Sequence, residues 1–168
     1  MRNLNQHYLE LLKRLNRVLD INIEMLEKQK FDKALYGECL IVEDTINNFE
    51  VKIKEDSIFT MARFQPAAGN LRLLIMLINS ARLVERMGDI LKANLKIIKN
   101  IEKESPEMVI HLKNIIYPVA TKTKNIYEGY INAFIKSDEK LLYSLMTMDE
   151  EIDELTKNDI TNIVEIMK

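Results

Sequence analysis

The chain has few of the residues that interrupt helices: its 168 residues include only 4 glycines and 3 prolines. It has no tryptophan, and aromatic residues make up 7% of it, so its core must consist mainly of aliphatic side chains and methionine. The single cysteine, Cys39, cannot form an internal disulfide and favours a reduced, cytoplasmic setting. This shortage of helix breakers predicts an all-α protein of long helices joined by short connections.

An excess of charge of one sign is also lacking, because 24 basic and 26 acidic residues leave a formal net charge of −2. A nucleic-acid-binding domain would need a basic excess, so we expect no nucleic-acid partner. No apolar run reaches the roughly 20 residues that span a bilayer, and the first segment, MRNLNQHYLELLKRL, is amphipathic and unlike a signal peptide. We therefore expect a cytoplasmic protein that is peripheral to the membrane only through its partners.

Signatures of catalysis are missing from the sequence. The two histidines, His7 and His111, do not belong to Glu-x-x-His pairs, which tells against a ferritin-like di-iron enzyme. The chain has no Gly-rich phosphate loop and no G-x-S-x-G nucleophile elbow. The sequence therefore predicts a protein that is not an enzyme.

Hydrophobic periodicity and breaker residues divide the chain into five segments of helical pattern. We predict helices at about 3–28, 32–61, 66–102, 106–136 and 138–167. Asp32 and Ser137 are candidate N-caps, and Ser105 precedes a proline at the first helical position. Pro118 is expected to kink the fourth helix or to mark a local break.

The second and fifth predicted helices match each other without gaps. FDKALYGECLIVEDTINNFE lies over SDEKLLYSLMTMDEEIDELT, so that Asp32 meets Asp138 and Glu43 meets Asp149. A tandem duplication explains this match, with repeat one at 1–103 and a partial repeat two at 104–168 of a single helical domain, 1–168. The third helix of the second repeat would begin beyond Lys168. We expect the unfilled groove to bind a second copy or a helix of another protein.

Two acidic pairs lie where apolar residues are expected. Asp149 and Asp153 continue the apolar stripe of the last helix, and Glu85 and Asp89 continue a line of aliphatic residues on the third. Carboxylates one turn apart on a packing face repel each other and lose hydration unless a cation lies between them. This cation would be a metal ion, a lysine or arginine, or a basic surface of a partner protein.

The residues themselves leave these alternatives open. Glu85 and Asp89 have the hard oxygen donors that suit iron, manganese, magnesium or calcium. They are also spaced for an ion pair within the helix, because Lys92 follows Asp89 by three residues. Asp149 and Asp153 would otherwise lie at a solvated edge of the stripe or pair with another helix. Glu43 is ambiguous because it lies in an acidic neighbourhood.

Three motifs resemble those of the PhoU family of phosphate-signalling proteins, in the family's order. QPAAGNLR at 65–72 resembles the family's Q-P-V-A-x-D-L-R, and LVERMGDILKAN at 83–94 resembles D-L-E-R-I-G-D-L-A-V-N. MDEEIDEL at 148–155 resembles the acidic D-x-x-x-D turn of the family's second helices. The resemblance implies an antiparallel helix bundle of the PhoU type, here one three-helix repeat plus a two-helix partial repeat.

The resemblance also implies a function. Members of this family are accessory regulators of the phosphate-specific ABC transporter, so the implied partners are the transporter ATPase and a phosphate-sensing histidine kinase. A homodimer is expected as well. The alternative from a different class is a structural helical-bundle adaptor unrelated to phosphate, whose acidic pairs serve only in salt bridges. A carboxylate-bridged metalloenzyme is disfavoured by the missing histidine ligands.

Some family members bind metal clusters through E/D-x-x-x-D pairs, which implies divalent or ferric ions such as iron, manganese, zinc or magnesium. Carried over to this sequence, one metal site would use Glu43, Glu85 and Asp89, and Asp149 and Asp153 would belong to a second. Two departures weaken the expectation. Asn47 stands where the family has an aspartate. The second site lacks a partner from a third helix.

Overall fold

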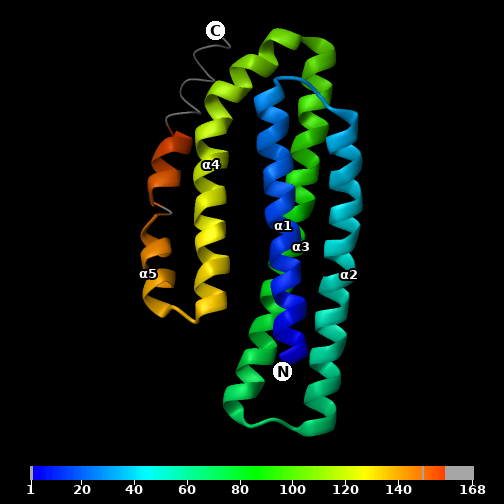
Figure 1. Cartoon of the computed structure of the whole chain (residues 1–168), viewed down its shortest axis with the longest axis vertical. Helices are drawn as coiled ribbons and strands as arrows, with labels where there is room; N and C mark the ends of the chain where they lie inside the picture. Colours follow the sequence, from blue (N-terminus) through cyan, green and yellow to red (C-terminus); the bar gives the residue numbers. More distant parts are fainter. Residues whose placement is uncertain (1, 149, 158–168) are drawn as a thin grey trace. The chain divides into compact units, whose positions relative to one another are not determined.

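The computed structural model describes residues 2–148 and 150–157, which are almost entirely helical and include no strand. Its helices, in order, are α1 (Arg2–Lys28), α2 (Lys33–Phe64), α3 (Ala68–Glu104), α4 (Pro106–Lys136) and α5 (Glu139–Thr147) (Figure 1). Residues 150–157 are helical as well. The all-α prediction is confirmed, and the helix ends from α1 through the start of α5 lie within three residues of the expected positions. The prediction of one continuous helix at 138–167 is wrong, because α5 ends at Thr147 and Met148 forms its C-cap. Residues 149 and 158–168 of that predicted helix lie outside the described residues.

The chain forms two compact units. Unit 1 consists of Met1–Val18 and Lys33–Asn94, and unit 2 consists of Leu19–Asp32 and Leu95–Lys168. Unit 1 thus contains most of α1 and α3 and all of α2, whereas unit 2 contains α4, α5 and the remaining ends of α1 and α3. Compactness and sequence duplication are different properties, so the predicted repeats, 1–103 and 104–168, stay a prediction.

Unit 1 is a three-helix bundle with an aliphatic core. The apolar residues of α1 recur every three or four positions and so form one buried stripe. Facing stripes on α2 and α3 complete the core. The buried apolar residues of unit 1 are Leu4, Tyr8, Leu11, Leu12, Leu15, Val18, Leu35, Cys39, Val42, Ile46, Ile53, Leu74, Leu77, Ala81 and Val84. This packing fixes which sides of α2 and α3 face each other, and it therefore positions the acidic residues described below.

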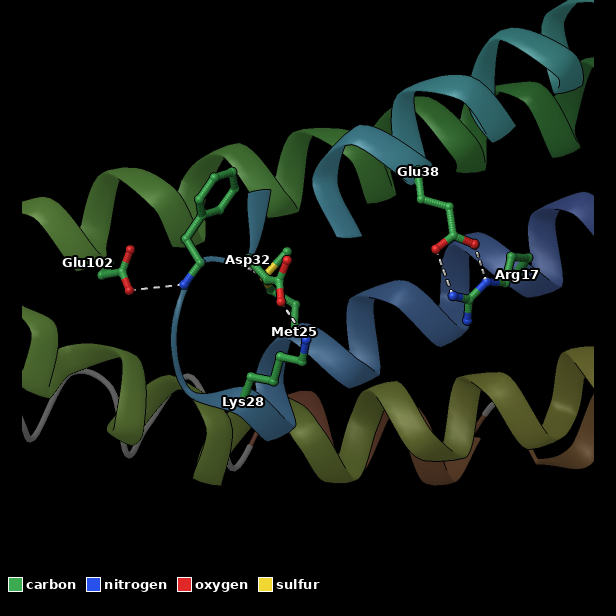
Figure 2. Close-up of polar contacts among 7 residues, drawn as sticks. Arg17, Met25, Lys28, Asp32, Glu38 and Glu102 are labelled. Atoms are coloured by element: carbon green, nitrogen blue, oxygen red, sulfur yellow. Dashed lines mark hydrogen bonds and ion pairs between the residues drawn. The ribbon is translucent and has the colours of Figure 1, made fainter. Parts of the chain in front are cut away.

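One bidentate ion pair joins α1 to α2 within unit 1. The Arg17 guanidinium donates from Nε to Glu38 Oε1 at 2.7 Å and from Nη2 to Oε2 at 2.9 Å (Figure 2). The hydrogen bond with Arg17 holds the pKa of the Glu38 carboxyl below its usual value. Because the Glu38 side chain is 43% exposed, solvent screening keeps the contribution of this pair to stability small. Its fork geometry mainly fixes the rotation of α1 against α2.

Unit 2 contains the connection between α1 and α2. Phe31 donates its backbone N–H to Glu102 of α3 at 3.0 Å, and the Asp32 N–H contacts the sulfur of Met25 at 3.1 Å (Figure 2). The Asp32 carboxylate, expected at an N-cap position, pairs with Lys28 across the turn. The connection is therefore held to both α1 and α3.

The hairpin of α4 and α5 belongs to unit 2. Pro106 lies at the start of α4 after Ser105, as expected, and the helix continues through Pro118. Figure 1 shows α4 changing direction in its first half, which fits a proline that removes one backbone donor. The N-cap expectation for Ser137 is wrong. Ser137 has a left-handed conformation (φ 53°) and ends α4, while the Asp138 side chain accepts a hydrogen bond from the Leu141 N–H and begins α5.

Candidate functional site

A lysine bridges two of the predicted metal ligands in unit 1. Lys92 Nζ lies 2.9 Å from Oε1 of Glu43 on α2 and 2.8 Å from Oδ1 of Asp89 on α3. Glu43 is buried, with 6% of its surface exposed, because it lies between Val42 and Ile46 on the core side of α2. Asp89 and Lys92 meet because residues three apart share a helix face. The same ammonium group therefore neutralises carboxylates from two helices.

Asn47 extends this network by one residue. Its side-chain N–H group donates to Glu43 Oε1 at 2.9 Å, which a carboxylate at this position could not do while ionised. Its own Oδ1 is buried and has no hydrogen-bond partner among the residues that the structure describes. Glu43 thus accepts from both Lys92 and Asn47.

The pKa values of the cluster follow from these contacts. Burial disfavours charged Lys92, but hydrogen bonds to Asp89 and Glu43 outweigh it and raise the pKa of the ammonium above its usual value. The hydrogen bond from Lys92 lowers the pKa of Asp89. Burial, followed by the nearby charge of Asp89, raises the pKa of Glu85. The cluster therefore contains a charged Lys92–Asp89 pair beside Glu85, which keeps its proton to a higher pH than an ordinary glutamate does.

The residues, as they are placed, do not fit a metal ion. Within residues 2–148 and 150–157, no three His, Cys, Asp or Glu side chains are arranged to hold a metal. Instead, the Lys92 ammonium lies where a cation would have to contact both Glu43 and Asp89. The ion-pair interpretation of Asp89 is confirmed by this geometry. Contrary to the expectation of an inward-facing pair, the Asp89 side chain is 50% exposed.

The second predicted site is only partly described. Asp149 lies outside the described residues. Asp153 lies on the helical segment 150–157 and is exposed, contrary to the expectation that it faces the bundle. The half-buried residues of this segment are Ile152 and Leu155, so Asp153 is turned toward solvent. Glu151, another acidic residue of this segment, forms an ion pair with Lys122 of α4.

Sequence reasoning missed the contact between Lys92 and Glu43. The three-residue spacing from Asp89 indicates the bond within α3, but the bond to α2 depends on how the two helices are aligned. The sequence did contain one signal for a cation in this cluster. Glu85, Asp89 and Lys92 are spaced four and three residues apart, which places the lysine on the same side of the helix as the two carboxylates. The Arg17–Glu38 pair had no comparable signal.

Comparison with known proteins gives one matching family and several similar proteins. The family model described as "PhoU domain" matches residues 8–98, which include Glu43, Glu85, Asp89 and Lys92. None of the described helices is long and apolar enough to cross a bilayer.

Curated relatives have similar sequences but are longer. A "phosphate-specific transport system accessory protein PhoU homolog" of Pseudomonas putida is 30% identical over 138 residues, covering 81% of this chain and 52% of the relative. The corresponding homolog of Pseudomonas aeruginosa is 29% identical over 138 residues, covering 81% of this chain and 55% of the relative. The Aquifex aeolicus homolog is 27% identical over 150 residues, covering 89% and 66%. The chain thus spans about half to two-thirds of the length of these relatives.

One solved structure matches the whole fold. The crystal structure of PhoU from Pseudomonas aeruginosa superposes with a TM-score of 0.85, covering 99% of this chain and 78% of that chain at 23% identity. This likeness shows that the helices share the PhoU arrangement.

Proposed function

Because this chain belongs to the PhoU domain family, we propose that it is a non-enzymatic regulator of phosphate transport and of phosphate-starvation signalling. The observation that carries the proposal is the family match over residues 8–98, which spans the three-helix bundle of unit 1 and its charged cluster. Relatives named as accessory proteins of phosphate-specific transport systems support the same function. The protein would act through contacts with other proteins.

The proposed partners are the ATPase of the phosphate ABC transporter and a phosphate-sensing histidine kinase. Both follow from the family resemblance, and the protein would meet them in the cytoplasm. In the charged cluster, Lys92 forms ion pairs with Glu43 and Asp89. None of these three residues is therefore positioned as a free nucleophile or general base, which agrees with regulation through protein contacts.

We propose that the cation of the unit 1 cluster is the Lys92 ammonium. The network joins α2 to α3 through Glu43 and so fixes the surface that the unit presents to partners. Binding of iron, manganese, zinc or magnesium by Glu43, Glu85 and Asp89 would require Lys92 to leave. The family resemblance implies metal binding, and this chain would bind a metal ion at these residues only after Lys92 had moved away from them.

We also propose that two copies associate through unit 2. α4 and α5 expose Ile135 at 55%, Tyr143 at 71% and Met146 at 71% of their surfaces. Large apolar side chains this exposed, on two neighbouring helices, favour contact with another protein surface. The sequence predicts a homodimer as well, with the unfilled groove of the second repeat open to a second copy or to a helix of another protein.

Deletion of the gene in its own host tests the proposed regulation. Phosphate uptake and a phosphate-starvation reporter are measured in phosphate-rich medium, with the wild-type gene supplied on a plasmid as the control. We expect uptake and reporter activity to rise on deletion and to return to normal with the plasmid. Unchanged uptake and reporter activity would contradict the proposal and favour the structural adaptor.

A further inference from the structure

The end of the α2–α3 hairpin in unit 1 has an unusual composition. Residues 57–84 contain none of the chain's 26 acidic residues and no lysine, although they include Arg63, Arg72 and Arg82. The α2–α3 turn projects beyond the start of α1 in unit 1, so the third helix of the bundle does not cover it (Figure 1). The hairpin end is therefore basic, and α1 leaves it uncovered within unit 1 (Figure 1).

Large apolar side chains are exposed at this end. The six that surround the turn expose between 37% and 64% of their surfaces: Ile58, Phe59, Phe64, Leu71, Ile75 and Met76. We call these six residues, with the exposed Arg63 and Arg72, the tip surface. Single exposed apolar residues are ordinary, but a group that surrounds one turn marks a surface used for binding.

Arg63 is held in place on the tip surface. Its guanidinium carbon lies 5.6 Å from the ring centre of Phe59 and 5.5 Å from that of Phe64. These contacts restrict the side chain, and the exposed guanidinium can still donate hydrogen bonds to a partner. An arginine that is already ordered loses less entropy when it binds a carboxylate.

We propose that the tip surface docks into an apolar groove on the transporter ATPase, and that carboxylates at the edge of this groove bind Arg63 and Arg72. This inference rests on the proposed function and names the surface that would carry it. Aromatic residues, methionine and arginine are enriched in protein interfaces, whereas lysine, glutamate and aspartate are depleted there. The segment 57–84 shares part of this bias, because it holds three of the chain's seven arginines and none of its lysines, glutamates or aspartates.

Two other occupants fit the tip surface less well. Surfaces that bind anionic lipid usually gather four or more lysines and arginines, but this one has two arginines and no lysine. A second copy that met it tip to tip would place Arg63 and Arg72 opposite themselves, without a carboxylate from residues 57–84 to neutralise them. An acidic groove of a different protein supplies the missing negative charge.

Binding of the purified full chain to the purified ATPase subunit from the same genome tests the proposal. The apolar variant is F59S/F64S, and the charge variant is R63E/R72E; all four residues are exposed, so circular dichroism should show an unchanged fold. The matched control is K33E/I41S, which alters one charged and one apolar exposed residue near the other end of α2. We expect each tip variant to lose at least about tenfold in affinity and the control to stay within about twofold of wild type.

Each other outcome has a defined meaning. Tip variants that bind the ATPase like wild type would overturn the docking surface and leave the proposed function standing. Absence of binding by the wild-type chain would overturn both. Vesicles of equal parts phosphatidylcholine and phosphatidylglycerol, and sedimentation of the protein alone, serve as parallel arms. Lipid binding or self-association that the tip variants abolish would show that a membrane or a second copy occupies the tip surface, and would overturn the assignment to the ATPase.

Discussion

Lys92 illustrates how a single side chain changes the chemistry of an acidic site. Glu43 is almost entirely buried, and an ionised carboxylate in such a place needs a cation and hydrogen bonds. Lys92 supplies both from the neighbouring helix, at 2.9 Å, while also holding Asp89 at 2.8 Å. A metal ion would meet the same need, so the two occupants compete for one position. In this structure the position is filled by a side chain of the protein itself.

Removal of this ammonium group should destabilise unit 1. We expect Lys92→Met to lower the free energy of unfolding by about 2–3 kcal/mol, because Glu43 then keeps a buried charge without its cation. Urea unfolding followed by circular dichroism measures the loss. Lys92→Arg, which keeps the charge, is the control and should lose less. Added manganese should raise the melting temperature of Lys92→Met and leave the wild type unchanged; a wild type that manganese stabilises equally would show that metal binds beside the lysine.

Glu85 should make stability depend on pH in the opposite sense to Asp89. Burial and the charge of Asp89 raise the folded-state pKa of Glu85 above 4.5, so the folded protein binds this proton more tightly than the unfolded chain. Stability from Glu85 is therefore full below pH 4.5 and is lost as pH rises through the folded-state pKa. Glu85→Gln cannot ionise, so it should be more stable than wild type at about pH 7 and equally stable at about pH 3.

Urea unfolding of both proteins at these two pH values gives the comparison. Glu55→Gln, on the exposed side of α2, is the matched control and should show no such difference. Asp89 has a lowered pKa, so its contribution is present at neutral pH and is lost on acidification in wild type and variant alike. If Glu85→Gln is instead less stable than wild type at about pH 7, the ionised Glu85 carboxylate must form a contact that stabilises the fold by more than burial of its charge destabilises it.

At the scale of elements, Gly88 and Gly129 both lie inside long helices, but they differ in how closely the neighbouring helix packs against them. A Cβ built on Gly88 of α3 would lie 3.4 Å from Ile46 Cδ1, which is an ordinary contact distance. A Cβ on Gly129 of α4 would lie only 2.7 Å from Leu145 Cδ2 on α5. Gly88 therefore leaves just enough room for a methyl group, whereas Gly129 is what allows α5 to lie close against α4.

The corresponding alanine variants should shift stability in opposite directions. Gly88→Ala should raise the free energy of unfolding by roughly 0.5–1 kcal/mol, because alanine favours the helix and meets no severe overlap. Gly129→Ala should lower it by about 1 kcal/mol, since displacement of Leu145 outweighs the helical gain. Chemical denaturation of the pair, with wild type alongside, checks both signs. Stabilisation by both substitutions would indicate that Leu145 moves aside without loss.

The boundary between α4 and α5 shows where local sequence rules succeed and where they stop. Ser137 and Asp138 are both good N-cap residues, and either could begin the helix. The structure uses Asp138, because Ser137 is needed in the left-handed conformation that ends α4. Helix existence follows from periodicity and breakers spread over many residues. The choice between adjacent caps depends on how one helix ends before the next begins.

For the whole molecule, the fold class and the helix positions could be predicted because each depends on local patterns. The directions of the acidic side chains could not. Asp153 was expected inside because the apolar stripe was followed along one continuous helix from 138, but α5 ends at Thr147 and Asp153 lies on the helical segment 150–157. The Lys92–Glu43 bond depends on the alignment of α2 against α3, which is set by packing across the whole of unit 1. Sequence predicted which residues are unusual, and packing decided what each of them contacts.

The two exposed apolar surfaces should have separate roles in the assembled protein. The tip surface lies in unit 1, and Ile135, Tyr143 and Met146 lie in unit 2. If unit 2 joins two copies, the double variant Y143S/M146Q should sediment as a monomer at concentrations where wild type is a dimer, with unchanged helix content because both side chains are 71% exposed. The tip variant F59S/F64S should sediment like wild type, since dimerisation would not use that surface.

Sedimentation velocity over a range of concentrations separates these outcomes. A wild type that stays monomeric at all concentrations would contradict the homodimer, and dissociation by the tip variant instead would assign dimerisation to unit 1.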